Sequence, residues 1–319
     1  MKIACDDGST YVKLAWRQDG EIKTHVVGNS FREGWKTELF GSEPVCNFLV
    51  DGRKYTHDVA STSTLSTTHI NYQYSDLNLL AVHYALLTSG IDPQSVELIV
   101  TLPVTEFFDA DAQINETNID KKRKNLLRSL DLNKGETFSI SKIEVMPESL
   151  PAILPVLSTE QVNSYEKSLV LDLGGTTLDC AVIVGAFESV SEIKGFPEIG
   201  TNQVTNAIVN ALTIASTQCS YFVADQVSRN ANDSEFLLRI VNDSSQVDRI
   251  KITISQETKN LAERVCRVIE SFNGIHRIYL TGGGGELIFN EIKKRYPVRK
   301  VIKLDQAQLA LVKAMIAGE

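Results

Sequence analysis

The sequence predicts an α/β protein built from two related domains. Its 319 residues exceed what one hydrophobic core usually spans, so two domains are expected. Short apolar runs typical of buried strands alternate with amphipathic stretches typical of helices, which is the pattern of an α/β fold. One motif also occurs twice, about half a chain length apart, which indicates duplication and not a short-period repeat.

Alternating or continuous apolar residues indicate the strands. The Asp51-Gly52 pair joins two such runs and predicts a tight hairpin, and Pro103 ends a buried run. The expected strands are 3–5, 11–16, 22–27, 45–50, 53–57, 97–102, 137–146, 169–184 as a hairpin, 188–194, 276–281 and 301–304.

Helical spacing of apolar residues, with caps and stops, indicates the helices. After Ser75 or Asp76 as cap, one apolar face is expected on a helix that ends near Gly90; it comprises Leu79, Leu80, Val82, His83, Leu86 and Leu87. A second helix over 116–130 is expected to turn Leu126, Leu127 and Leu130 inward. Further helices are expected after Gly200 and over 256–273, 286–296 and 306–317. Residues 216–256 give no clear pattern beyond a polar loop at 229–234.

The repeated motif is an apolar run, Asp-x-Gly, a Gly or Ser, a Thr and a second apolar run. The first copy covers residues 3–13 and the second covers 170–179. Two such turns could hold one polyphosphate from both sides. The aligned pairs are Asp6 with Asp172, Gly8 with Gly174 and Thr10 with Thr176.

The first copy carries the chemistry of a phosphate site. A glycine such as Gly8 lets the backbone approach phosphate oxygens, and successive turn N–H groups form an anion-binding concavity. Ser9 and Thr10 add hydroxyl donors, and Lys13 on the returning strand would neutralise a phosphate. An Asp near phosphates needs a cation between them, so Asp6 implies Mg²⁺, held through water. Taken alone, this copy is more simply explained as an ordinary hairpin with Asp-Gly turn chemistry.

The second copy favours the phosphate reading. It is too rich in glycines and hydroxyls for a simple hairpin, through Gly174, Gly175, Thr176 and Thr177. Asp172 is the natural partner of Asp6 across the phosphates and the metal. Asp179 has a weaker case, because it could serve the fold or pair with a nearby backbone group.

A glycine run gives a third binding surface. A strand, the run Gly282, Gly283, Gly284 and Gly285, and a helix start follow one another. A G-x-G-x-x-G dinucleotide site is disfavoured, since Leu287 or Ile288 stands where glycine is required, and no P-loop sequence occurs. The ligand predicted by all three surfaces is a nucleotide.

Composition excludes several other classes. The net charge of −8 argues against broad direct contact with DNA, which needs a concentration of Lys and Arg. We expect no export signal, no membrane span and a reducing cytoplasm, because apolar stretches are short and the five cysteines are scattered. The five histidines lack metal-site spacing, and His83 is expected to be a packed core or interface residue. The basic run 121–124 is expected on a solvated face, with contact to an acidic neighbouring subunit as the alternative.

With these motifs in this order, the chain resembles the actin, sugar kinase and heat-shock-70 ATPase superfamily over essentially its whole length. Within it, the chain is most similar to the plasmid-segregation actins of the ParM (StbA) group. Besides the motifs above, the residues that carry this resemblance are 74–76, His83, 85–90, 101–103 and 145–149.

The resemblance implies an actin-like (ribonuclease H-like) duplicated fold, with a nucleotide in the cleft between domains. Domain I would comprise residues 1–160 plus 303–319, and domain II residues 161–302. The chain would pass from domain I to domain II near residues 158–168, and the polar composition of that stretch agrees with a domain boundary.

The resemblance also implies site roles. Asp6 and Asp172 would hold Mg²⁺ through waters, with Asp172 also catalytic, and Glu148 would orient or activate the attacking water. From the residues alone, Glu148 could equally be a helix N-terminal acid after Pro147. The phosphates of ATP or GTP would bind Gly8, Ser9, Thr10, Lys13, Gly174, Gly175, Thr176 and Thr177. Adenosine and the α-phosphate would lie along Gly282, Gly283 and Gly284.

The implied function is a nucleotide-driven filament that segregates plasmid DNA. The chain would bind copies of itself head to tail and would reach centromere-like DNA only through a DNA-binding adaptor of the ParR type. A monomeric small-molecule kinase is the alternative, with Asp172 or Asp179 as its base, although no substrate-specific motif is seen. A chaperone-like switch would need a peptide-binding domain, for which we expect no room.

Overall fold

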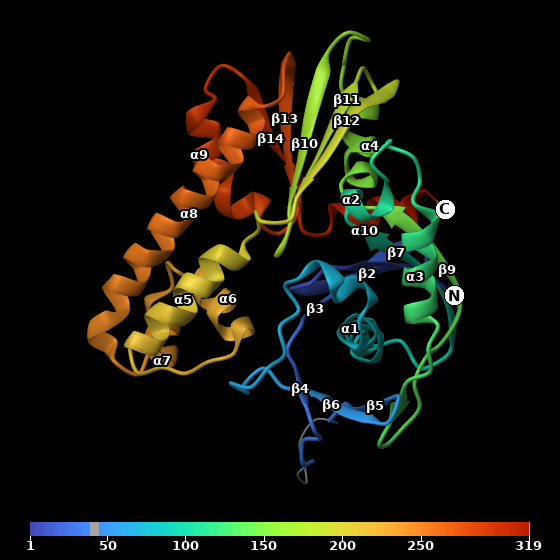
Figure 1. The fold of residues 1–319 in the computed structure, drawn as a ribbon, viewed down its shortest axis with the longest axis vertical. Helices are drawn as coiled ribbons and strands as arrows, with labels where there is room; N and C mark the ends of the chain where they lie inside the picture. Colours follow the sequence, from blue (N-terminus) through green and yellow to red (C-terminus); the bar gives the residue numbers. More distant parts are fainter. Residues whose placement is uncertain (39–44, 319) are drawn as a thin grey trace.

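Two five-stranded sheets of the same topology form the framework of the part of the chain that the computed structural model describes, residues 1–38 and 45–318 (Figure 1). Across each sheet, from one edge to the other, the first two strand pairs are antiparallel and the next two are parallel. In spatial order, the first sheet contains β3 (Glu21–Gly28), β2 (Tyr11–Gln18), β1 (Lys2–Asp7), β7 (Ser95–Leu102) and β9 (Ser139–Pro147). The second contains β12 (Ser189–Phe196), β11 (Leu178–Val184), β10 (Lys167–Leu173), β13 (Ile275–Thr281) and β14 (Lys300–Lys303). The duplication inferred from the repeated motif therefore extends to whole sheets.

A small antiparallel sheet lies apart from these two, and helix α1 (Asp76–Leu87) lies between it and the first sheet (Figure 1). Asp51 and Gly52 both take positive φ, of 47° and 78°, as the predicted tight hairpin requires. Strand β4 was not expected, because three residues give too short a pattern. In spatial order the sheet contains β4 (Phe31–Glu33), β6 (Arg53–His57), β5 (Asn47–Val50) and β8 (Asp131–Leu132).

Three sequence expectations for the first half are wrong. Helix α1 is buried nearly all round and has no single apolar face, since β-structure covers it on two sides. Helix α3 (Glu116–Leu126) ends before Leu127, whose side chain is therefore exposed and not inward. Lys122 is fully buried, so the basic run is not simply a solvated face.

Helices α4 (Leu150–Thr159) and α10 (Ala310–Ala317) lie between the two large sheets (Figure 1). One apolar cluster joins these helices to Ala4 and Ala15 of the first sheet and to Val170 and Ala181 of the second. Each sheet is covered on its other face by a separate core, formed with α1 on the first sheet and with α5 (Asn202–Ile214), α8 (Val247–Glu270) and α9 (Gly285–Arg295) on the second. The last helix of the chain thus packs beside its first strands.

The segment 216–256 is helical where the sequence gave no pattern. It forms α6 (Tyr221–Arg229), α7 (Ser234–Ile240) and the first turns of α8, so that the expected polar loop is shorter than 229–234. Short helices complete the described chain: η1 (Ile70–Tyr74), α2 (Val104–Phe107) and η2 (Ser244–Gln246). None of the described helices is both long and apolar enough to cross a membrane.

Candidate functional site

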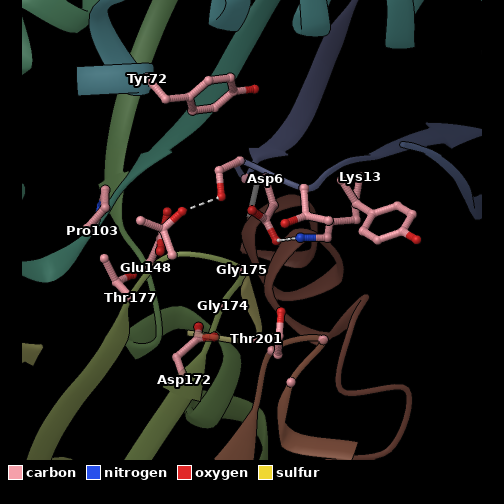
Figure 2. Close-up of a pocket in the computed structure, with 18 of the residues that line it drawn as sticks. Asp6, Lys13, Tyr72, Pro103, Glu148, Asp172, Gly174, Gly175, Thr177 and Thr201 are labelled. Atoms are coloured by element: carbon pink, nitrogen blue, oxygen red, sulfur yellow. Dashed lines mark hydrogen bonds and ion pairs between the residues drawn. The ribbon is translucent and has the colours of Figure 1, made fainter. Parts of the chain in front are cut away.

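One cleft gathers all the residues to which the family resemblance assigns a site role (Figure 2). It lies at the carboxyl ends of the parallel strands of both sheets, where α/β proteins commonly bind ligands. The predicted residues that line it are Asp6, Gly8, Ser9, Thr10, Lys13, Glu148, Asp172, Gly174, Gly175, Thr176, Thr177, Gly282, Gly283 and Gly284.

In the first hairpin, residues 6–13, strand register sets Lys13 directly opposite Asp6. Lys13 Nζ donates to Asp6 Oδ2 at 2.9 Å, an ion pair that Figure 2 draws as a dashed line. Asn29 holds the turn from behind, because its side-chain amide donates to the carbonyls of Gly8 and Ser9, each at 2.9 Å. The turn is therefore fixed before any ligand binds.

In the second hairpin, residues 172–179, the same register sets Asp179 opposite Asp172, so Asp179 occupies the place that Lys13 has in the first. Asp179 is buried, and both its oxygens are engaged. Oδ2 accepts from Thr177 Oγ1 at 2.8 Å, and Oδ1 accepts from the Val104 N–H at 3.2 Å. Asp179 thus connects the second sheet to the start of α2, which agrees with a structural role for this residue.

The two hairpins face each other in contact. Ser9 Oγ and Thr176 Oγ1 are hydrogen-bonded at 2.7 Å, although they lie in different halves of the chain. Gly175 permits this approach, because a Cβ there would stand 2.0 Å from Thr10 Oγ1. The buried Thr10 hydroxyl has no hydrogen-bond partner within the described chain. Hydroxyls and turn N–H groups from both halves therefore converge on one place.

The glycine turn, residues 282–285, follows β13, which pairs with β10 so that Thr281 lies beside Asp172. Gly282 has a φ of 76°, and a Cβ on it would meet Asp172 Oδ1 at 2.2 Å. Gly284 donates its N–H to the Leu173 carbonyl at 2.8 Å. Close packing against the second hairpin explains Gly282, and it leaves the backbone of Gly283 at the cleft surface.

Glu148 enters the cleft from the end of β9. Its N–H donates to the Leu102 carbonyl at 2.8 Å, which fixes the chain beside the end of β7. The next residue, Ser149, takes a φ of 71°, a left-handed conformation that is uncommon outside glycine. Ser149 Oγ is buried without a hydrogen-bond partner in the described chain. Strained residues of this kind are often found at functional sites, and this one turns the chain directly after Glu148.

Burial and the charges of neighbouring carboxylates raise the pKa values of two cleft carboxyls, Asp172 and Glu148. Burial first, then the charges of Asp6 and Asp179, raises the pKa of Asp172 to about 7. Burial also raises the pKa of Asp179 to about 6, although the bonds from Thr177 and Val104 act in the other direction. The pKa of Glu148 is well above its ordinary value, because of burial and then the charges of Asp179, Asp6 and Asp172.

Lys13 stands among these acids as a permanent cation. Burial lowers the pKa of Lys13, but the facing carboxylates, Asp6 foremost, outweigh burial, so that this pKa is raised. These carboxyl groups outnumber the positive charges beside them, because several carboxyls surround the single ammonium group of Lys13. A cleft of this kind favours a divalent cation.

The donor set fits Mg²⁺ held through water. Mg²⁺ commonly binds one or two carboxylates and completes its shell with waters and substrate phosphates. Asp6 and Asp172 supply such carboxylates, each close enough to raise the pKa of its neighbours. Within the described chain, no group of three or more His, Cys, Asp or Glu side chains could hold a metal ion by itself. Phosphate oxygens or water would have to supply the remaining ligands.

Sequence reasoning missed several residues that line the cleft. Tyr11 gave no signal beyond being a strand residue, and Arg229 lies in the segment without a readable pattern. The 3-10 helix η1 forms one wall and carries no motif. The other residues missed are His69, Ile70, Tyr72, Gln73, Pro103, Thr201, Gln308 and Leu311.

Two family models together cover almost the whole chain. The model described as "Plasmid segregation protein ParM, N-terminal" matches residues 1–159, and the one described as "Plasmid segregation protein ParM, C-terminal" matches residues 162–318. The chain belongs to the ParM plasmid-segregation family. No curated protein matches its sequence.

Solved structures agree on the fold of this ParM family member. A 15-stranded ParM filament from Clostridium botulinum has a TM-score of 0.73 at 16% identity, over 99% of this chain and 98% of that one. An archaeal actin homologue in complex with ADP has a TM-score of 0.67 at 17% identity, over 98% and 97%. The AlfA filament from a B. subtilis plasmid has a TM-score of 0.60 at 15% identity, over 100% and 98%. The fold is therefore actin-like.

Proposed function

We propose that this chain is a polymerising actin-like ATPase that binds ATP or GTP in the cleft between the two hairpins. The observation that carries the proposal is the contact of Ser9 with Thr176, which brings the two turns predicted to bind phosphate face to face in the cleft that Asp6 and Glu148 also line. Membership of the ParM family supports it, and so does the ADP named with the archaeal actin homologue.

The hairpins would hold the phosphates from both sides. Turn N–H groups and hydroxyls donate to phosphate oxygens, and Lys13 adds a positive charge. Asp6 and Asp172 would hold Mg²⁺ through water, and a bound Mg²⁺ neutralises phosphate charge. The phosphate-binding set comprises Gly8, Ser9, Thr10, Lys13, Gly174, Gly175, Thr176 and Thr177, and the glycine turn would lie along the nucleoside end through Gly282, Gly283 and Gly284.

Glu148 would orient the attacking water and accept its proton. Its support is position: the side chain lines the same cleft as the hairpins and comes from the end of a strand that the Leu102 carbonyl fixes. Asp172 would assist as the second acidic group beside the phosphates. Asp179 is a poor candidate for the base of a small-molecule kinase, because Thr177 and Val104 occupy both its oxygens.

Nucleotide binding would join two domains, residues 1–160 plus 303–319 and residues 161–302. The packing of α10 against β1, β2 and α4 supports the return of the chain to the first domain. The joined form would assemble head to tail into an open helical polymer, and hydrolysis would remove the phosphate contacts that hold it closed. Filaments named among solved relatives support assembly. A DNA-bound adaptor of the ParR type would connect the polymer to plasmid DNA.

Pelleting and light scattering with nucleotides test the proposal. We expect sedimentable polymer with ATP or GTP and with a non-hydrolysable analogue, and none without nucleotide. Polymer should disappear as phosphate accumulates when the nucleotide can be hydrolysed. Absence of polymer at every nucleotide and protein concentration tried would refute the proposal, whereas ADP release that depends on a sugar or acid acceptor would favour a kinase.

A further inference from the structure

Gln73 is a buried residue in the cleft wall that η1 forms. It lines the cleft although it is only 5% exposed. Its side-chain oxygen accepts a hydrogen bond from Lys122 Nζ. An ammonium group can only donate, so this contact fixes which end of the amide is oxygen and which is nitrogen. Within the described chain the amide nitrogen donates to no other group, and solvent still reaches it. Its N–H donors are therefore left for something bound in the cleft.

The lysine that orients Gln73 is itself fixed. Lys122 is fully buried, forms an ion pair with Asp7 and donates to Asn78 Oδ1 at 3.0 Å. Asn78 Nδ2 in turn donates to Asp7 Oδ2 at 2.7 Å. Lys122 thus uses its three donors on three acceptors. The amide of Gln73 cannot turn round without leaving a buried ammonium short of a partner, which is costly.

The buried aspartate of this cluster also contacts the segment that fixes Glu148. Asp7 Oδ1 accepts from the Thr101 N–H at 3.2 Å. The next residue, Leu102, accepts the N–H of Glu148 through its carbonyl at 2.8 Å. Through the buried lysine on one oxygen and this backbone N–H on the other, Asp7 helps to fix both Gln73 and Glu148. An amide donor and a carboxyl acceptor are therefore held from one point and line the same cleft.

We propose that Gln73 is a further catalytic residue for nucleotide hydrolysis, whose amide donates to the attacking water while Glu148 accepts a proton from that water. The donor occupies one lone pair of the water and the acceptor takes one hydrogen, so the other lone pair can be aimed at the γ-phosphorus. Lys122 acts through Gln73 and is a positioning residue. The inference rests on the proposed nucleotide site.

The chemical step leaves Gln73 unchanged. The water oxygen forms the new bond to the γ-phosphorus, and the bond from that phosphorus to the oxygen bridging the β-phosphate breaks. Glu148 receives one proton of the water, and the products are the nucleoside diphosphate and inorganic phosphate. Gln73 contributes by orienting the water, a contribution that is largest in the transition state.

Single-turnover hydrolysis of ATP and of GTP at saturating concentration tests this role. Gln73→Met keeps the length of the side chain and loses the N–H donors, so hydrolysis should slow about 100-fold, the usual cost of removing one positioning group. Affinity for a non-hydrolysable analogue should change less than about twofold, because the amide contacts the water and not the nucleotide. A purely structural role would instead weaken binding and hydrolysis together.

A second variant and a control guard against a folding defect. Gln73→Glu keeps an oxygen acceptor for Lys122, but a carboxylate has no N–H donor, so hydrolysis should again be slow while thermal unfolding matches that of wild type. This variant decides the question if Gln73→Met does not fold. Asn71→Leu is the matched control, because Asn71 is an exposed amide on η1 outside the cleft lining, and its hydrolysis rate should equal that of wild type.

The double variant Gln73→Met with Glu148→Gln tests whether both side chains act on one water. Groups that serve the same water act as a unit, so the double variant should be about as slow as the slower single variant. Multiplied losses would overturn the inference, as would wild-type rates in a folded Gln73 variant or an equal loss of analogue affinity. If wild-type protein hydrolyses neither ATP nor GTP, the proposed function fails first, so the two failures are distinguishable.

Discussion

At the scale of single residues, the second aspartate of the first hairpin has a structural task. Asp7 is fully buried and forms an ion pair with the equally buried Lys122. Lys122 also donates to Asn78 Oδ1 at 3.0 Å and to Gln73, which lines the cleft. The basic run of α3 thus contains one residue that supports the phosphate turn from behind, while Lys121 and Lys124 are exposed.

Lys122→Met should be strongly destabilising. Removing one partner of a buried pair leaves an uncompensated charge, here on Asp7, at a cost of about 3–5 kcal/mol. Urea unfolding measures the change in the free energy of unfolding. The double variant Asp7→Asn with Lys122→Met should recover part of the loss, because no charge is then left buried. Lys124→Met, on the exposed side of the same helix, is the control, and equal effects of Lys122→Met and Lys124→Met would contradict the assignment.

His83 makes stability depend on pH. The side chain is 3% exposed, and burial lowers its pKa from 6.5 to about 4. Between these values the unfolded chain binds a proton that the folded chain does not, so the free energy of unfolding falls as pH falls through this window. The loss is about 3 kcal/mol by pH 4, from the size of the shift. Urea titrations from pH 7 to 4 should show a shallower pH dependence in His83→Leu, and identical slopes would refute the argument.

At the scale of elements, the duplicated hairpins have diverged at one position that register makes equivalent. Lys13 neutralises Asp6 in the first hairpin, whereas Asp179 stands opposite Asp172 in the second and bonds to the start of α2. The first hairpin therefore keeps a cation beside the cleft. The second uses the same position to attach the two halves of the chain to each other.

Gly282→Ala tests the packing of the glycine turn on the second hairpin. The substitution combines a positive φ with a Cβ 2.2 Å from Asp172 Oδ1, so Asp172 must move. Gly20→Ala is the matched control, since Gly20 has a φ of 80° with nothing within 4 Å of its Cβ position. Both should lose about 1–2 kcal/mol of stability from backbone strain. We expect at least tenfold weaker nucleotide binding, measured by fluorescence titration, in Gly282→Ala alone; equal affinities would show that the contact is unimportant.

At the scale of the whole molecule, contacts at three places hold the two halves of the chain together. The hairpins meet through Ser9 and Thr176, α2 meets Asp179, and α6 meets Tyr11. Helices α4 and α10 fill the space between the sheets behind them. A ligand bound between the hairpins would therefore contact both halves and affect how they are positioned relative to each other.

Glu148→Gln should separate assembly from disassembly. The amide keeps the shape of the carboxyl but cannot accept a proton, so nucleotide binding and polymer formation should persist. Phosphate release should slow about 100-fold or more, the usual cost of removing one positioning group. Polymer should then outlast wild-type polymer, as followed by light scattering alongside phosphate release. Unchanged turnover would exclude the role of Glu148, and loss of nucleotide binding would indicate a structural one.

The strands around the motifs could be predicted because their apolar runs are short, continuous and bounded by glycine or proline. The Asp51-Gly52 hairpin is such a case, and both residues take the positive φ that the turn requires. The apolar face on α1 and the inward Leu127 were wrong predictions. Periodicity cannot show that a helix is covered on both sides, or that it ends at Leu126 and not at residue 130. Helix α6 was missed because its nine residues contain only short apolar runs, too few to establish a helical period.

The sequence by itself determined the duplicated motif, its glycines and acids, and the resemblance that leads to the family. These are local features, since a turn residue acts through its own backbone freedom and charge. Only the tertiary structure decided that Lys122 lies behind the turn, that Asp179 binds Val104, and that Arg229 reaches the cleft. Each depends on segments far apart in the chain being brought together by packing, which local patterns do not encode.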